Sequence, residues 1–200
     1  MSGHRRAGRL NKIVLDALEW VYNKALAMLT QPAGGIGIVE KLDSGYSVEE
    51  ERMGNIERLK TLCDEAVASP TFFPRDGRSY CNFAAQYIAE GMGFFGFPAN
   101  TLANDMIDLL AVTPGWVEDT IERAHRHAMR GGLAFLCLTD YPHGHLAAVY
   151  PAPMEPSGTW GEDVPVLSNV GQKNGIMKTS AVYRLETRPL IRAFLWGETV

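Results

Sequence analysis

The chain has 200 residues, of which 46% are hydrophobic, and its 19 basic and 23 acidic residues give a formal net charge of -4. This length and composition favour a soluble globular protein of one or at most two domains, because they suffice to bury a substantial core. The near balance of charge argues against nucleic acid as a partner, since binding to phosphates requires a basic surface.

The chain also lacks the usual signals for export and membrane insertion. Asp16, Glu19 and Lys24 interrupt the apolar core that a signal peptide would need in the first thirty residues. No apolar run approaches the roughly 18 residues that span a bilayer. We therefore expect synthesis in the cytoplasm without a Sec signal, no transmembrane segment, and delivery by a non-Sec route if the target lies in the periplasm or cell wall.

Helical patterns dominate the first part of the chain. Apolar residues recur at helical spacing over residues 10–29, and Pro32, Gly34 and Gly35 follow. A capping box begins at Ser47, and a second apolar stripe continues to Val67. We predict that residues 1–70 form an N-terminal helical extension and that residues 71–200 form the main domain.

Three further helices are predicted, after which the pattern changes to strands. The helices begin at Cys81, Thr101 and Trp116, and the last of them is expected to reach Met129. Short apolar runs between Pro and Gly turns then predict strands. These runs cover residues 133–138, 145–150, 164–170, 180–185 and 191–196. Helices that precede strands, without a strand-helix repeat, indicate an α+β fold with helices packed on a central antiparallel sheet.

The three cysteines are expected to have different roles. An odd number without close pairs does not fit a disulfide scaffold or a zinc knuckle. Cys63 lies on an apolar helical stripe and Cys137 in an apolar strand, so both are predicted to be core thiols. Cys81 opens a helix, where unpaired N–H groups and the helix dipole favour a thiolate.

A second chemical element is His145, which follows Gly144 and enters an apolar strand. A lone histidine in a strand is most often a structural residue hydrogen-bonded to backbone. Together, however, a cysteine at a helix start and a histidine at a strand start meet the requirements of a thiol-imidazole pair. His143 and His145 could also form a metal pair, but no motif completes such a site, so we expect neither metal nor cofactor.

Several blocks of the sequence resemble the NlpC-like branch of the papain-like peptidases and amidases, and within it the type VI secretion amidase effectors and phage lysis enzymes. The block Cys81–Ala85 resembles their cysteine helix, and Gly144–Val149 resembles their Gly-His strand. Residues 99–106 resemble an Asn/Ala-rich segment of their substrate cleft, and residues 131–135 the strand that precedes the histidine. Ser168–Gly171 resembles their Asn-Val-Gly strand. The resemblance covers about residues 78–196.

The resemblance implies a papain-like fold in which Cys81 is the nucleophile and His145 the general base. A polar residue on the next strand would orient the imidazole, and Asn169 is the preferred candidate, with Ser168 and Gln172 as rivals. Ser168 and Asn169 cannot both face the histidine, because side chains alternate along a strand.

Four further residues are candidates for substrate binding. Tyr80 and Asn82 flank the nucleophile and could assist backbone N–H groups in binding the oxyanion. Asn100 and Asn104 lie in the segment that resembles a substrate cleft.

The implied activity is a peptidoglycan amidase or endopeptidase that cuts stem or cross-link peptides, as an antibacterial effector or a phage lysis enzyme. Its partners would be the peptidoglycan peptide and an immunity or delivery protein. The alternatives are an acyltransferase or protein peptidase on the same fold, because fold does not fix the substrate, and a non-catalytic binding protein in which Cys81 and His145 only pack.

Overall fold

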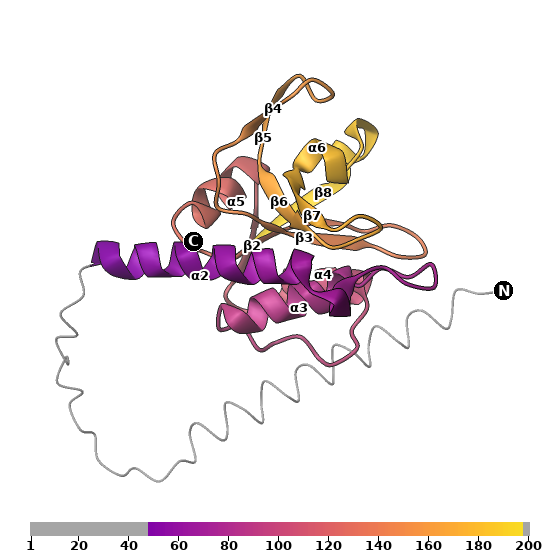
Figure 1. The fold of residues 1–200 in the computed structure, drawn as a ribbon, viewed down its shortest axis with the longest axis horizontal. Helices are drawn as coiled ribbons and strands as arrows, with labels where there is room; N and C mark the ends of the chain where they lie inside the picture. The colour runs from indigo at the N-terminus through magenta and orange to yellow at the C-terminus, as the bar shows by residue number, and fades with distance from the viewer. Residues whose placement is uncertain (1–47, 198–200) are drawn as a thin grey trace, which may run out of the picture. The chain divides into compact units, whose positions relative to one another are not determined.

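The computed structural model describes residues 48–197 (Figure 1). They form an α+β arrangement of helices around a six-stranded antiparallel sheet. The helical segments are α2 (Val48–Ala68), η1 (Pro70–Phe72), α3 (Cys81–Gly91), α4 (Ala103–Val112), α5 (Ile121–Ala128), α6 (Thr179–Val182) and η2 (Leu185–Leu190). The helix expected over residues 10–29 lies outside the described residues.

The main sheet has the strand order β1-β8-β2-β3-β6-β7, and every neighbouring pair is antiparallel. Its strands are β1 (Trp116–Asp119), β2 (Ala134–Leu138), β3 (His145–Val149), β6 (Val166–Asn169), β7 (Gly175–Lys178) and β8 (Ile191–Trp196). A separate hairpin consists of β4 (Glu155–Ser157) and β5 (Glu162–Val164). The central strands β2 and β3 are almost wholly buried, so the sheet is covered on both faces.

Helix α2 packs against α3 and against strands β6 and β7 (Figure 1). The apolar stripe predicted from the sequence supplies this contact, because Leu59, Cys63 and Ala66 are fully buried. The Ser168 hydroxyl donates a hydrogen bond of 3.0 Å to the Cys63 carbonyl and so ties the helix to β6. The domain boundary near residue 70 stays a prediction, but α2 precedes that boundary and contributes to the core.

The prediction of a helix over residues 116–129 was wrong for its first four residues. Residues 116–129 do not form a single helix, because Trp116–Asp119 pairs with β8 as strand β1. Helix α5 begins only after Thr120, whose hydroxyl accepts a hydrogen bond of 3.2 Å from the Arg123 N–H. Strand pairing and this N-cap together override the helical spacing.

The predicted strand over residues 180–185 was also wrong. Thr179–Val182 is the short helix α6, which lies beside β6 and β7. The Thr179 hydroxyl, which is fully buried, donates a hydrogen bond of 2.7 Å to the Pro165 carbonyl. This contact fixes the start of α6 against the end of the β4-β5 hairpin.

The sequence predicts no transmembrane segment. Helix α2 is the longest of the described helices. Within residues 48–197, no helix combines the length and the hydropathy needed to cross a bilayer.

Candidate functional site

Helix α3 places Cys81 at its first position, after Tyr80 as N-cap. The first backbone N–H groups of a helix have no partner within the helix. Here the N–H groups of Cys81 and Asn82 lie against the Cys81 sulfur, and the Ser79 hydroxyl is a further neighbour of it. The Cys81 residue is only 5% exposed. Cys81 therefore lies in a buried position surrounded by hydrogen-bond donors.

The thiol also contacts strand β3 at a point where the sheet opens. Even-numbered residues of β3 direct their N–H groups toward β6, as the 2.9 Å bond from Tyr150 N–H to the Val166 carbonyl shows. Strand β6 pairs with β3 only at Ala148 and Val149, so the Leu146 N–H has no partner on β6. That N–H lies against the Cys81 sulfur instead. The nucleophile candidate thus occupies the gap between β3 and β6, beside the backbone of His145.

His145 is the first residue of β3, and Asn169 is the last residue of β6. The strand register pairs Ala148 with Ser168, which makes His145 and Asn169 diagonal neighbours on one face of the sheet. Their side chains meet, with 2.8 Å between His145 Nε2 and Asn169 Oδ1. Among residues 48–197, the imidazole forms its side-chain hydrogen bond with Asn169. No hydrogen bond joins the imidazole directly to the Cys81 thiol in this part of the chain.

The orientation of the Asn169 amide determines which histidine tautomer is present. Asn169 Nδ2 donates a hydrogen bond of 2.6 Å to the Lys173 carbonyl, so Oδ1 must be the atom that faces His145. An amide oxygen only accepts, and the hydrogen therefore resides on His145 Nε2. Nδ1 therefore carries no hydrogen, and its lone pair is free to accept a proton, as a general base requires.

The two rival residues for this role are placed elsewhere. Ser168 is buried on the opposite face of the sheet, where it bonds to Cys63. Gln172 is exposed in the turn between β6 and β7. Of the three candidates, only Asn169 contacts the imidazole.

Burial shifts the pKa values of both Cys81 and His145. Burial lowers the pKa of His145, and the hydrogen bond to Asn169 partly opposes this shift. Burial also raises the pKa of the Cys81 thiol, against the lowering effect of the surrounding N–H groups and of Ser79. Both shifts favour the neutral forms, a thiol and a neutral imidazole, over an ion pair.

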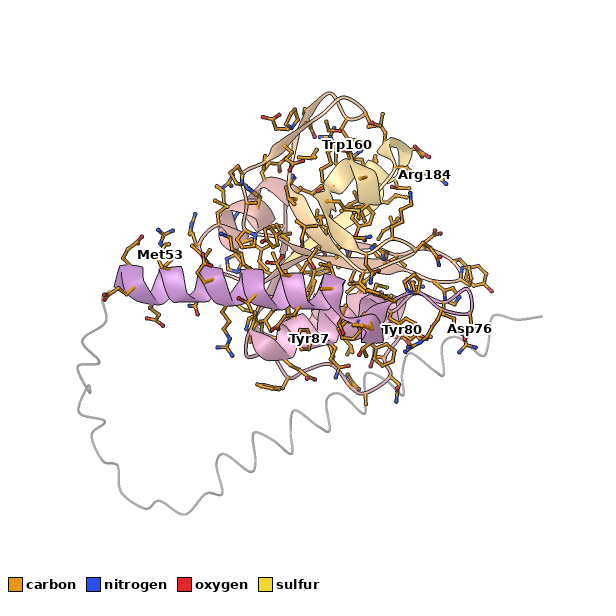
Figure 2. All side chains as sticks on the ribbon, viewed as in Figure 1. Met53, Asp76, Tyr80, Tyr87, Trp160 and Arg184 are labelled. Atoms are coloured by element: carbon orange, nitrogen blue, oxygen red, sulfur yellow. The ribbon has the colours of Figure 1, made fainter. Side chains whose placement is uncertain are left out.

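The four predicted substrate-binding residues are placed unequally. Asn82 Nδ2 donates to the Thr101 carbonyl at 2.8 Å, and Asn104 Nδ2 donates to the Asp140 carbonyl at 2.8 Å. Tyr80, labelled in Figure 2 at the start of α3, accepts a hydrogen bond of 2.9 Å from Arg75 Nε. Asn100 is exposed and has a positive φ of 61°. Two of the three asparagine amides are thus already bonded to loop backbone, one just before α4 and the other just after β2.

Asn104 has a second contact that explains Gly144. A Cβ atom built on Gly144 would lie 2.1 Å from Asn104 Oδ1 and 3.0 Å from the Leu138 carbonyl. Real Cβ atoms do not approach so closely, so only glycine fits directly before His145. Asn104 therefore helps to shape the loop that leads into β3.

Tyr183 packs against His145, and no sequence pattern predicted this contact. The ring centroids are 5.7 Å apart in an edge-on arrangement, and the Tyr183 hydroxyl donates a hydrogen bond of 2.6 Å to the Leu136 carbonyl. Burial raises the pKa of Tyr183 well above its ordinary value, so its hydroxyl stays protonated and remains a donor. A tyrosine about forty residues after the histidine could not be assigned to this position from spacing.

The alternative metal pair finds no third partner in the described part of the chain. Across residues 48–197, no three His, Cys, Asp or Glu side chains come together as a set of metal ligands.

Neither the protein-family models nor the curated proteins compared with this sequence include a match. The geometry of the site therefore carries the functional argument.

Proposed function

We propose that the protein is a cysteine amidase in which Cys81 attacks a peptide carbonyl and His145 acts as general base. The observation that carries this proposal is the position of the Cys81 thiol. It lies among the N–H groups at the start of α3 and against the N–H of Leu146, the residue that follows His145. On His145 itself, the contact with Asn169 leaves Nδ1 free to accept a proton.

The reaction that these groups would perform has two halves. His145 Nδ1 takes the thiol proton as sulfur attacks the carbonyl carbon, and the N–H groups of Cys81 and Asn82 can donate to the developing oxyanion. The imidazolium then protonates the leaving amine, and a thioester remains on Cys81. In the second half, Nδ1 takes a proton from water, hydroxide displaces the thiolate, and the imidazolium returns a proton to sulfur.

The neutral resting pair is compatible with this mechanism. Proton transfer would accompany the attack, so the thiol does not need to be ionised before substrate binds. The absence of a direct bond between thiol and imidazole is also compatible, because catalytic hydrogen bonds are often long without substrate. The proposed mechanism requires the Cys81 sulfur and His145 Nδ1 to come within hydrogen-bond reach when substrate binds.

We propose peptidoglycan as the substrate, with cleavage in the stem or cross-link peptide. The support is the resemblance of Cys81–Ala85, Gly144–Val149 and Ser168–Gly171 to the NlpC-like amidases, together with the papain-like fold which that resemblance implies. The order of a cysteine at a helix start, a histidine at a strand start and a polar residue on the neighbouring strand agrees with it. The biological setting would be an antibacterial effector or a phage lysis enzyme, delivered by a non-Sec route.

Digestion of purified sacculi tests the proposal. The full chain should release soluble muropeptides, and mass analysis should show a new amino group at one defined peptide bond. Cys81→Ala should release none. Cys137→Ala is the matched control, because it removes a thiol that is fully buried in the neighbouring strand β2 and should still digest sacculi.

The alternatives predict different outcomes of the same comparison. Cys81-dependent cleavage of proteins, or acyl transfer to an added amine, with intact sacculi would indicate the same fold acting on another substrate. The absence of any Cys81-dependent covalent intermediate with sacculi, proteins or acyl donors would indicate a non-catalytic binding protein.

A further inference from the structure

The turn between β6 and β7 contains a residue that no sequence pattern connects with the site. Asn174 lies at the end of this turn and is half-buried. Its Oδ1 accepts a hydrogen bond of 3.1 Å from the Gly171 N–H, and its Nδ2 donates one of 3.2 Å to the Phe72 carbonyl. One side chain thus closes the turn and fastens it to η1, 102 residues earlier in the chain.

The turn that Asn174 closes is the one that orients Asn169. The Lys173 carbonyl, which accepts from Asn169 Nδ2, belongs to this turn, and so does Gly171. A Cβ on Gly171 would lie 3.5 Å from both Asn169 Nδ2 and His145 Cε1, so the turn backbone borders both side chains. Hydrogen bonds and the backbone of the turn together therefore connect Phe72, through Asn174, with Asn169 and His145.

We infer that Asn174 is a positioning residue for the His145 imidazole. It holds the Lys173 carbonyl where that carbonyl fixes the Asn169 amide, and the amide in turn keeps the hydrogen of His145 on Nε2. One of its bonds closes the turn on itself, and the other holds the turn to η1. The importance of this tautomer for turnover rests on the proposed function, but the positioning itself does not.

The test measures His145 directly in the full-length protein. Long-range proton-nitrogen NMR spectra distinguish the Nε2–H from the Nδ1–H tautomer, and a pH titration gives the midpoint for the same ring. Comparison with His145→Gln assigns the signals among the five histidines. Asn169→Ala should mix the tautomers and lower the midpoint, because the Asn169 bond raises the His145 pKa.

Asn174→Ala should change the tautomer population and midpoint in the same direction as Asn169→Ala, by a smaller amount. Asn174→Asp keeps the acceptor for the Gly171 N–H but loses the donor to Phe72, so its tautomer population should lie between those of wild type and Asn174→Ala. It also carries the test if Asn174→Ala does not fold. Gln172→Ala, an exposed neutral substitution in the same turn, is the matched control and should resemble wild type.

Two outcomes would overturn the inference. One is a wild-type tautomer population in folded Asn174→Ala, or in Asn174→Asp if the alanine variant is unfolded. The other is an equal change in Gln172→Ala, which would make the effect a general property of the turn. If sacculi stay intact while Asn174→Ala still alters the His145 signals, the proposed function fails and the positioning role stands.

Discussion

The contact between His145 and Asn169 is the most specific feature of the site at the scale of single residues. An amide that accepts from Nε2 orients the ring without adding charge. Loss of a general base typically lowers the rate by about 10² to 10⁴. We expect Asn169→Ala to lower kcat on one muropeptide by an amount at or below the low end of that range, and His145→Ala to lower it more.

The neighbours of Asn169 provide controls for this prediction. Ser168→Ala should leave kcat unchanged but lower the free energy of unfolding by about 1 kcal/mol, because the buried Cys63 carbonyl loses its donor. Gln172→Ala should change neither quantity. Unimpaired turnover in Asn169→Ala together with slow turnover in either neighbour would show that the orienting residue is assigned wrongly.

The pH dependence of activity follows from the burial of His145. In the proposed mechanism His145 must be neutral to accept a proton, and burial holds its pKa below the ordinary value of about 6.5. Activity should therefore persist to a lower pH than an exposed histidine would permit. The acid limb of kcat/KM against pH measures this, and an acid limb above the ordinary histidine value would contradict the expected environment of the base.

Helix α2 shows at the scale of elements how a sequence pattern becomes packing. Leu59, on its apolar stripe, is fully buried, whereas Met53 on the same helix is 46% exposed. Leu59→Ala should lower the free energy of unfolding by about 2 to 5 kcal/mol, since it leaves a cavity between the helix and the sheet. Met53→Ala should cost far less, and chemical denaturation of the two variants compares them.

A small loss in Leu59→Ala, equal to that of Met53→Ala, would mean that α2 packs loosely on the sheet. The helix would then behave as the separate extension that the sequence alone suggested. A large loss would instead make α2 part of the same cooperative unit as α3 and the sheet, because the unfolding of one would expose the other.

Elements were predictable where local pattern and tertiary packing agree. Helix α3 begins at Cys81, and strands β2, β3 and β8 lie within the predicted apolar runs. The pattern failed at Trp116–Asp119, where helical spacing coincides with a segment that completes the sheet edge beside β8. Pairing with a distant strand contributes nothing to local periodicity, so no local rule could have found β1.

Buried titratable groups link the stability of the whole molecule to pH. Unfolded histidine has a pKa of about 6.5, whereas burial lowers that of His145 in the folded protein. As the pH falls below that value, the unfolded state therefore binds more protons than the folded state. The contribution of His145 to the free energy of unfolding decreases until the pH reaches the pKa of the folded state. We expect the thermal midpoint to fall on mild acidification less steeply in His145→Gln than in wild type.

The core thiols give a second prediction for the whole molecule. Cys63 and Cys137 are fully buried, and burial raises the pKa of Cys63 to about 12. The double variant Cys63→Ala, Cys137→Ala should therefore keep its turnover and lose on the order of a few kcal/mol of stability, as core truncations do. A folded double variant without activity would mean that Cys81 is not the nucleophile.

The sequence by itself determined the features that depend on neighbours along the chain. It indicated an α+β fold, the helix start at Cys81, the strand start at His145 and, through strand alternation, that Ser168 and Asn169 face opposite sides of the sheet. Only the tertiary structure decided which groups meet. The Leu146 N–H is available because β6 diverges from β3, and the Asn169 amide is oriented by a carbonyl in a turn that Asn174 fastens to Phe72. These contacts depend on strand register and on segments about a hundred residues apart, and local periodicity carries no information about either.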